Sequence, residues 1–402
     1  MHTSLTELAA WLRLSLTPGV GNATARRLMV RFGAPEHIFS QSAAQLETCA
    51  SAKQVQALLT HPPDWETQHA RLLQWLQASS STQHHALIPL GDPRYPPALL
   101  QIEDPPLMLY AMGHARWLDT EQPLLDTPRA LAMVGSRNPT AQGIANARQF
   151  AQHLCQQQWC VVSGMALGID AAAHEGALAS MAQAALASGT QPPTVAVVGT
   201  GIDRIYPRQN AALAREIAQH GVIVSEYPLG TPPVAANFPK RNRLIAGMSA
   251  GTLVVEAALA SGSLVTARLA SEQGREVFAI PGSIHAPQSK GCHALLRQGA
   301  KLVETVQDIW DELPMSVSGR EMVRASPTPS HSPSTAASAT PTPDNQEHPL
   351  FQALGFDPQS LDMLQARSGW ETAALQAWLL EQELEGHVAR LPGGWFQRVV
   401  QG

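Results

Sequence analysis

The sequence predicts a doubly wound α/β domain with a mostly parallel sheet, preceded by a helical domain and followed by a small helix-and-hairpin domain. Short apolar runs alternate with helical patterns from about residue 87 to residue 312. The runs are apolar throughout, which is typical of parallel strands that are buried on both faces of a sheet. The chain has 402 residues, which is more than one ordinary domain contains.

Changes in composition divide the chain into four segments. We predict a SAM-like or helix-hairpin-helix-like helical domain (1–80), the α/β domain (81–313), a linker (314–347) and a terminal domain (348–402). The linker is rich in Ser, Thr, Ala and Pro and cannot bury a core, so we expect it to be extended and mobile.

The helical domain contains a turn with two interpretations. Pro18-Gly19-Val20-Gly21 lies between two helical patterns and resembles a helix-hairpin-helix turn, whose backbone amides can face a DNA phosphate. The same residues are equally typical of a plain turn, in which Gly ends one helix and Asn22 caps the next. The sequence leaves both interpretations open.

Strands and helices alternate through the α/β domain. We expect strands at Ala130–Val134, Cys160–Val162, Thr194–Val198, Val222–Val224, Thr252–Val255 and Glu276–Ile280. Helical patterns lie near Thr140–Gln157, Asp170–Leu186, Arg208–His220, Arg241–Met248, Ser263–Gln273 and Lys290–Gln298. In the terminal domain, two helical patterns precede two β-runs joined by Pro392-Gly393-Gly394, and this order predicts a winged-helix domain.

The net charge of −5 is unevenly distributed along the chain. Residues 1–128 carry 8 basic and 11 acidic side chains, residues 129–312 carry 14 and 12, and residues 313–402 carry 5 and 9. Only the middle segment is cationic, which permits a local phosphate-binding patch but argues against indiscriminate coating of duplex DNA. The acidic terminal domain fits a protein interaction better than duplex binding.

The sequence lacks features that would direct the chain out of the cytoplasm. It has no run of about 18 apolar residues, and no basic segment followed by an apolar one at its N-terminus. Its four cysteines form no C-x-x-C pair, as expected of reduced thiols. We therefore expect a cytoplasmic protein with no membrane span and no metal site.

Two glycine-rich loops follow predicted strands and lead into predicted helices. In the first, Val134-Gly135-Ser136-Arg137-Asn138-Pro139-Thr140, we expect Arg137 to bind a phosphate and Thr140 to cap the helix. In the second, Ser163-Gly164-Met165-Ala166-Leu167-Gly168-Ile169-Asp170, Gly164 permits close approach of the backbone, and Asp170 either caps the helix or orders the loop. Ligands bind outside the carboxyl ends of such strands, so we expect both loops to present free N–H groups to an anion.

The segment Asn237-Phe238-Pro239-Lys240-Arg241-Asn242-Arg243 gives the strongest indication of function. Lys240, Arg241 and Arg243 can contact phosphates, and Phe238 can stack on an unpaired base. On a helix, residues 240 and 243 share one face while 241 points about 100° away, so the three cations cannot serve one phosphate equally. The alternative interpretation is a solvated basic turn with Phe238 in the core.

Later loops add weaker candidates. Ser263 and Thr266 can donate hydroxyls to a phosphate or cap their helix, and Lys290 can add a phosphate contact. No P-loop, metal-ligand spacing or nucleophile elbow is present, and no G-x-G-x-x-G follows the first strand. We therefore expect no cofactor and no enzymatic activity.

Together these segments resemble the DprA/Smf family of DNA-processing proteins. The resemblance begins at Gly91-Asp92-Pro93-Arg94-Tyr95-Pro96 and continues through V-G-S-R, S-G-M-A-L-G-I-D, F-P-K-R-N-R, G-S-L-V-T-A and I-P-G-S to about Trp310. It implies an extended Rossmann fold, usually dimeric, in a cytoplasmic protein that protects incoming single-stranded DNA and helps to load the RecA recombinase during natural transformation. The DNA site that the resemblance implies comprises Arg137, Gly164, Phe238, Lys240, Arg241, Asn242 and Arg243, with Ser163, Ser263 and Thr266 as lesser members.

Two functions of other classes remain open. Nucleotide phosphoribohydrolases of the lysine-decarboxylase-like group have a similar Rossmann domain and a P-G-G-x-G-T-x-x-E signature. Gly251-Thr252 and Glu256 match that signature here, but its Pro-Gly-Gly is absent. A scaffold that only joins partners would leave the basic F-P-K-R-N-R segment unexplained.

Overall fold

The computed structural model describes residues 4–182, 190–313, 348–355, 358–391 and 393–399. The chain divides into two compact units, Met1–Leu313 and Pro314–Gly402, and each is described by itself. The predicted linker lies outside the described residues. Among the described helices, none has the length and apolar character that a membrane span needs.

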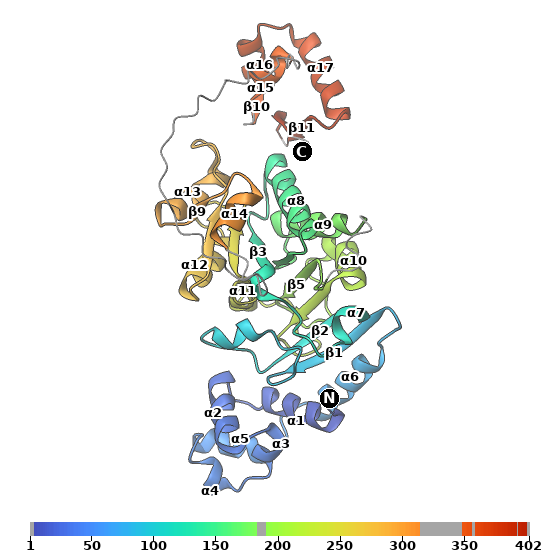
Figure 1. Cartoon of the computed structure of the whole chain (residues 1–402), viewed down its shortest axis with the longest axis vertical. Helices are drawn as coiled ribbons and strands as arrows, with labels where there is room; N and C mark the ends of the chain where they lie inside the picture. The colour runs from blue at the N-terminus through green and yellow to red at the C-terminus, as the bar shows by residue number, and fades with distance from the viewer. Residues whose placement is uncertain (1–3, 183–189, 314–347, 356–357, 392, 400–402) are drawn as a thin grey trace, which may run out of the picture. The chain divides into compact units, whose positions relative to one another are not determined.

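A nine-stranded sheet forms the centre of the first unit, in the order β1-β2-β6-β5-β4-β3-β7-β8-β9 (Figure 1). Its parallel strands are β3 (Ala130–Val134), β4 (Cys160–Ser163), β5 (Thr194–Val198), β6 (Val222–Ser225), β7 (Gly251–Val254), β8 (Glu276–Ala279) and β9 (Lys301–Leu302). The chain adds strands on one side of β3 as far as β6, and then on the other side from β7 to β9. The predicted doubly wound sheet is confirmed, and its strand order reverses between β3 and β7.

Side chains of the parallel strands alternate between two cores. Ala130, Ala132 and Val134 of β3 pack on the side of α11 (Asn237–Gly247), α12 (Ser263–Glu272) and α13 (Lys290–Arg297). Leu131 and Met133 pack on the opposite side, against α8 (Ala141–Gln156) and α9 (Ile169–Ala179), which lie side by side (Figure 1). Burial on both faces explains why the strand runs are apolar throughout rather than alternating.

An antiparallel hairpin extends the sheet beyond β6. It consists of β1 (Gln83–Pro89) and β2 (Met108–His114), and β2 pairs with β6. The strands expected from the sequence begin at Ala130, so this hairpin is an addition to the predicted sheet. The short α7 (Ala115–Leu118) follows β2, and α14 (Val306–Glu312) follows β9.

The N-terminal helices share a core with the hairpin and with α10 (Ala211–His220). They are α1 (Leu5–Leu16), α2 (Asn22–Phe32), α3 (Pro35–Phe39), α4 (Ala43–Leu46), α5 (Ala52–Leu59) and α6 (Trp65–Gln77). In the turn between α1 and α2, the Gly19 carbonyl accepts a hydrogen bond from Gln54 Nε2 at 2.7 Å. Gly21 takes the cap position of α2, and Asn22 instead donates to Asp104 at 3.1 Å, so the cap that the plain-turn interpretation assigned to Asn22 is absent.

The second unit has the winged-helix order that the sequence predicts. It comprises α15 (Pro349–Leu354), β10 (Gln359–Ser360), α16 (Leu361–Ser368), α17 (Thr372–Leu384), β11 (Val388–Leu391) and β12 (Trp395–Arg398). The strands form a small sheet in the order β10-β12-β11, and a core around Leu364, Leu375, Leu379 and Phe396 joins it to the helices.

The first unit contains a buried histidine with one unpartnered ring nitrogen among the described residues. His174 of α9 is fully buried, with its Nδ1 2.6 Å from Thr194 Oγ1. The Thr194 hydroxyl donates its only proton to the Val161 carbonyl at 2.7 Å, so Nδ1 must be the protonated donor. Nε2 has no hydrogen-bond partner among the described residues, and burial lowers the pKa of His174 to about 3.

We expect the free energy of unfolding to fall as the pH drops below 6.5, because the unfolded histidine gains a proton that the folded protein excludes. This contribution amounts to about 2 kcal/mol between pH 6.5 and pH 5, and it continues to grow toward pH 3. Urea unfolding of wild type and His174→Gln at several pH values measures it. The control variant His153→Gln changes an exposed histidine, so its free energy of unfolding should fall with pH as much as that of wild type. A fall as large as that of wild type in His174→Gln would contradict the assignment to His174.

Candidate functional site

A pocket of about 700 Å³ lies at the carboxyl ends of the strands, where their order reverses. We call it the switch-point pocket. Its walls come from the loop after β3, from the first turns of α11 and α12, and from Tyr206. Ligands of doubly wound sheets bind at such a point. Of the residues that the sequence singled out, the pocket brings together Arg137, Phe238, Arg241, Asn242, Ser263 and Thr266.

Arg137 supplies an available cation at this pocket. Its side chain is exposed, and within the described part of the chain no hydrogen bond or ion pair holds its guanidinium. The backbone around it is fixed, because Ser136 N donates to the Glu256 carbonyl at 2.7 Å and Asn138 N donates to Ser136 Oγ at 3.1 Å. Arg137 therefore projects from an ordered loop with its donors free for a ligand.

Arg241 is a second cation, and it forms part of the pocket wall. It is 4% exposed, and its guanidinium donates to the carbonyls of Gly164, at 2.8 Å, and Val197. Burial lowers the pKa of Arg241 to about 10, so it stays charged at neutral pH, and the charge of Asp170 supports it. A Cβ on residue 164 would lie 2.6 Å from this guanidinium, so glycine is required there for close packing of Arg241.

Two carboxylates accept hydrogen bonds from backbone amides that we expected to be free for an anion. Asp170 accepts hydrogen bonds from Gly164 N at 3.2 Å and Ala166 N at 3.4 Å, and it thereby orders the second glycine loop. Glu256 accepts from Thr140 N at 3.0 Å and from the Thr140 hydroxyl, which itself accepts from Gly143 N. The prediction that both loops offer these N–H groups to an anion is therefore wrong.

Two helices, α11 and α12, begin at the pocket. Neither helix has an acidic residue in its first turn, although Ser263 N of α12 donates to Ser261 Oγ at 3.3 Å and Asn237 N of α11 donates to the Val234 carbonyl at 3.0 Å. The start of α12 and the residues just before it also bring hydroxyls to the pocket, with Ser261 Oγ 2.7 Å from Ser263 Oγ. Helix N-termini carry partial positive charge, so both ends favour an anion between them.

Two aromatic rings line the same pocket. Phe238 packs against Tyr206, with ring centroids 5.4 Å apart and ring planes 37° apart. Tyr206 is 46% exposed, so part of its ring is open to a ligand. Tyr206 was not among the residues selected from the sequence. Its only sequence signal is an aromatic residue in a loop that follows a buried strand.

α11 begins at Asn237, four residues before the predicted helix at Arg241–Met248, and its geometry separates the three cations. Arg241 faces the pocket, whereas Arg243 forms an ion pair with Glu226 and lies 3.8 Å from Asp104. Lys240 is exposed and lies outside the pocket lining. Burial raises the pKa of Glu226, and the charges of Arg243 and Lys240 partly offset this effect by lowering it. Residues 240 and 243 thus share the side of α11 that faces Glu226.

Other selected residues also lie outside the pocket lining. Ser163 is buried, and its hydroxyl donates to the Met133 carbonyl at 2.6 Å. Lys290 donates through Nζ to the Ile284 carbonyl. Gly164 contributes through Arg241, as described above. The structure therefore places Ser163, Gly164, Lys240, Arg243 and Lys290 away from the pocket surface.

Comparison with known protein families gives two matches. Residues 86–314 match the family described as DNA recombination-mediator protein A, and residues 334–394 match the family described as DprA winged helix domain. The first match includes every residue that lines the switch-point pocket.

Individual proteins extend this similarity over nearly the whole chain. The chain is 37% identical to Protein Smf of Escherichia coli (strain K12) over 387 residues, which is 96% of this chain and 94% of that protein. It is 40% identical to DNA processing protein DprA of Bacillus subtilis (strain 168) over 227 residues, or 56% of this chain and 71% of that protein. The X-ray structure of DNA processing protein A from Streptococcus pneumoniae is similar with a TM-score of 0.60 and 31% identity, covering 78% of this chain and 99% of that one.

Proposed function

This chain belongs to the DprA/Smf family of DNA-processing proteins, and on that premise we propose that it binds single-stranded DNA in the switch-point pocket. The observation that carries the proposal is the juxtaposition of the available Arg137 guanidinium with the exposed ring of Tyr206. A guanidinium suits a phosphate, and an exposed ring suits an unpaired base.

The remaining pocket residues fit roles in the same recognition. The positive ends of the α11 and α12 dipoles and the Ser263 hydroxyl favour a phosphate, and Asn242 can hydrogen-bond to a base or sugar. In a duplex the base faces are stacked on each other, so the ring of Tyr206 can add affinity only for an unpaired strand. We therefore assign the pocket to a flexible single strand.

Glu256 argues against the phosphoribohydrolase alternative. Its carboxylate is bonded to the backbone and hydroxyl of Thr140, and it does not line the switch-point pocket. A Cβ on residue 143 would collide with the same carboxylate, so the start of α8 is built around it. Glu256 serves here to hold the loop after β3, and we propose no enzymatic role for it.

A direct test compares oligo-dT with a duplex of equal length by fluorescence anisotropy over a range of salt concentrations. We expect tighter binding of oligo-dT, weakening steeply with salt because phosphate contacts release counterions. Equal or tighter duplex binding would refute the proposal. Incubation with nucleoside monophosphates should release no base, and robust release would favour the hydrolase instead.

We further propose that the protein acts in the cytoplasm as a homodimer, protects incoming single strands during natural transformation and helps to load RecA. Family membership supports this role. Nuclease digestion of a single strand, with and without the protein, measures protection. The rate of RecA filament formation on the same strand measures loading, and light scattering measures the mass in solution. Unaltered digestion and filament formation would contradict these roles while leaving DNA binding intact.

Tyr206 provides a test of base stacking. We expect Tyr206→Ala to weaken oligo-dT binding about tenfold, because stacking of one base contributes about 1–3 kcal/mol. Tyr206→Phe retains the ring and is the matched control, so it should bind nearly as wild type does. Equal losses in the two variants would show that the hydroxyl, rather than the ring, contacts the DNA.

A further inference from the structure

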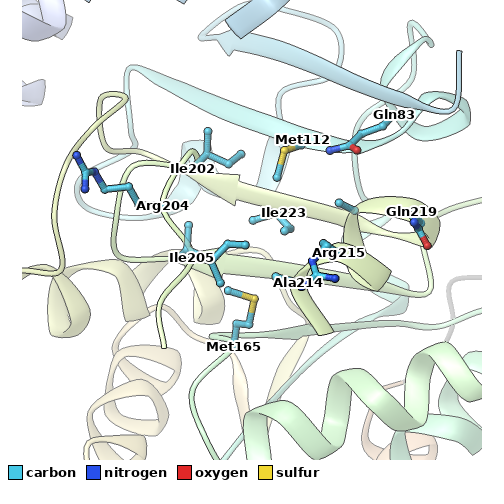
Figure 2. A pocket seen from close by; sticks show the side chains of 12 residues that line it. Gln83, Met112, Met165, Ile202, Arg204, Ile205, Ala214, Arg215, Gln219 and Ile223 are labelled. Atoms are coloured by element: carbon cyan, nitrogen blue, oxygen red, sulfur yellow. The ribbon is translucent and has the colours of Figure 1, made fainter. Parts of the chain in front are cut away.

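A second pocket, of about 190 Å³, lies between α10, β2 and β6 (Figure 2). We call it the Met/Ile pocket. Aliphatic side chains form most of its surface: Met112, Met165, Val198, Ile202, Ile205, Ala214, Ala218 and Ile223. Gln83, Arg204, Arg215 and Gln219 complete the lining, with Arg204 and Gln219 at opposite sides of the view (Figure 2).

The charges at this pocket have one sign. Arg204 and Arg215 are the ionisable residues of the lining, and both side chains are exposed. In the part of the chain that the structure describes, neither guanidinium takes part in a hydrogen bond or an ion pair. An apolar pocket with two available cations at its edge is complementary to an apolar group accompanied by negative charge.

The size and surface of the pocket narrow the choice of ligand. Its volume is below the roughly 300–1,000 Å³ of typical small-molecule pockets, and suits a single large apolar side chain. Among the described residues that line it, none has an aromatic ring on which a nucleobase could stack, and the aliphatic interior offers no hydrogen bonds to the edges of a base. We propose that the Met/Ile pocket binds an acidic peptide segment of a partner protein, which inserts one apolar side chain between Arg204 and Arg215.

The Met/Ile pocket adjoins the switch-point pocket through consecutive residues. Met165 lines the former and Ala166 the latter, and likewise Ile205 lines the former and Tyr206 the latter. Met165 has a φ of 57°, a conformation that side chains disfavour, and Asn210 Nδ2 holds its carbonyl at 2.9 Å. A partner bound here would lie beside the proposed DNA site, although peptide binding itself does not require that site.

The test uses the full chain and a labelled short peptide with one phenylalanine flanked by aspartates. We expect saturable binding by anisotropy that weakens with salt. Replacing the phenylalanine with serine should reduce affinity more than tenfold, because the buried anchor is lost. Arg204→Gln and Arg215→Gln should each reduce the affinity for the peptide about fivefold, as expected when an exposed ion pair is lost. Arg31→Gln on α2 is the control and should leave the affinity for the peptide unchanged.

Oligo-dT binding separates this proposal from the DNA site. Arg215→Gln should leave oligo-dT affinity unchanged, and Arg137→Ala should leave peptide affinity unchanged. Absence of peptide binding, or binding insensitive to both arginine substitutions, would overturn the proposal. So would loss of oligo-dT binding in Arg215→Gln with the peptide unaffected, because the Met/Ile pocket would then be part of a nucleic-acid surface.

Discussion

Replacing Arg137 with alanine should weaken oligo-dT binding by at least about tenfold at low salt. The guanidinium is exposed and unpaired among the described residues, so it can contact a phosphate without breaking an existing hydrogen bond or ion pair. A hydrogen bond to a charged group contributes about 1.5–3 kcal/mol, which corresponds to roughly a tenfold to a hundredfold change in affinity. Anisotropy titrations of wild type and variant over a range of salt concentrations measure this loss.

The salt dependence identifies the nature of the contact. Loss of one phosphate contact on a single strand should reduce the slope of log K against log salt by about 0.7. Arg268→Ala is the matched control, because this exposed arginine of α12 lies outside the pocket lining and pairs with Glu272 at 2.8 Å. A loss as large in Arg268→Ala as in Arg137→Ala would indicate that general charge, not the pocket, binds the DNA.

The features that the sequence predicted correctly are those set by local patterns. β3 is apolar at all five positions because both of its faces are buried, and this leaves a direct signal in the sequence. α8 spans Ala141–Gln156, close to the predicted Thr140–Gln157, because Thr140 caps it and the apolar spacing continues to its end. The hairpin strand β1 begins with Gln83, His84 and His85, and only its second half is buried, so no continuous apolar run marks it.

The features that the sequence could not provide depend on partners distant along the chain. The Glu256 carboxylate accepts a hydrogen bond from the amide of Thr140, which lies 116 residues earlier in the chain. This amide was expected to bind an anion and is no longer available for one. Helical periodicity separates Arg241 from Arg243, but the position of Glu226 at the end of β6 decides which of them faces the pocket. Tyr206 follows β5 and Phe238 follows β6, so their contact depends on the pairing of these two strands in the sheet.

Arg241→Met should cause the largest loss of stability among the pocket substitutions. The carbonyls of Gly164 and Val197 would lose their donor, and the buried Asp170 carboxylate would lose its supporting charge. Removal of one partner from a buried charged arrangement costs about 3–5 kcal/mol. We therefore expect urea unfolding of Arg241→Met at a much lower midpoint, together with weaker oligo-dT binding. The exposed neighbour Lys240→Met is the control, with an expected change within about 0.5 kcal/mol.

A double-mutant cycle separates the electrostatic role of Arg241 from its packing. Burial raises the pKa of Asp170 and the charge of Arg241 lowers it, so the two charges compensate each other in the wall of the pocket. Asp170→Asn removes the negative charge and keeps a carbonyl oxygen that can accept from Gly164 N. If compensation is the main role, the double variant Asp170→Asn/Arg241→Met should be more stable than the sum of the single losses predicts, by about 1–3 kcal/mol. Strict additivity would instead assign the loss of stability to the hydrogen bonds that Arg241 donates to the carbonyls of Gly164 and Val197. The guanidinium would then stabilise the protein mainly by joining the ends of β4 and β5.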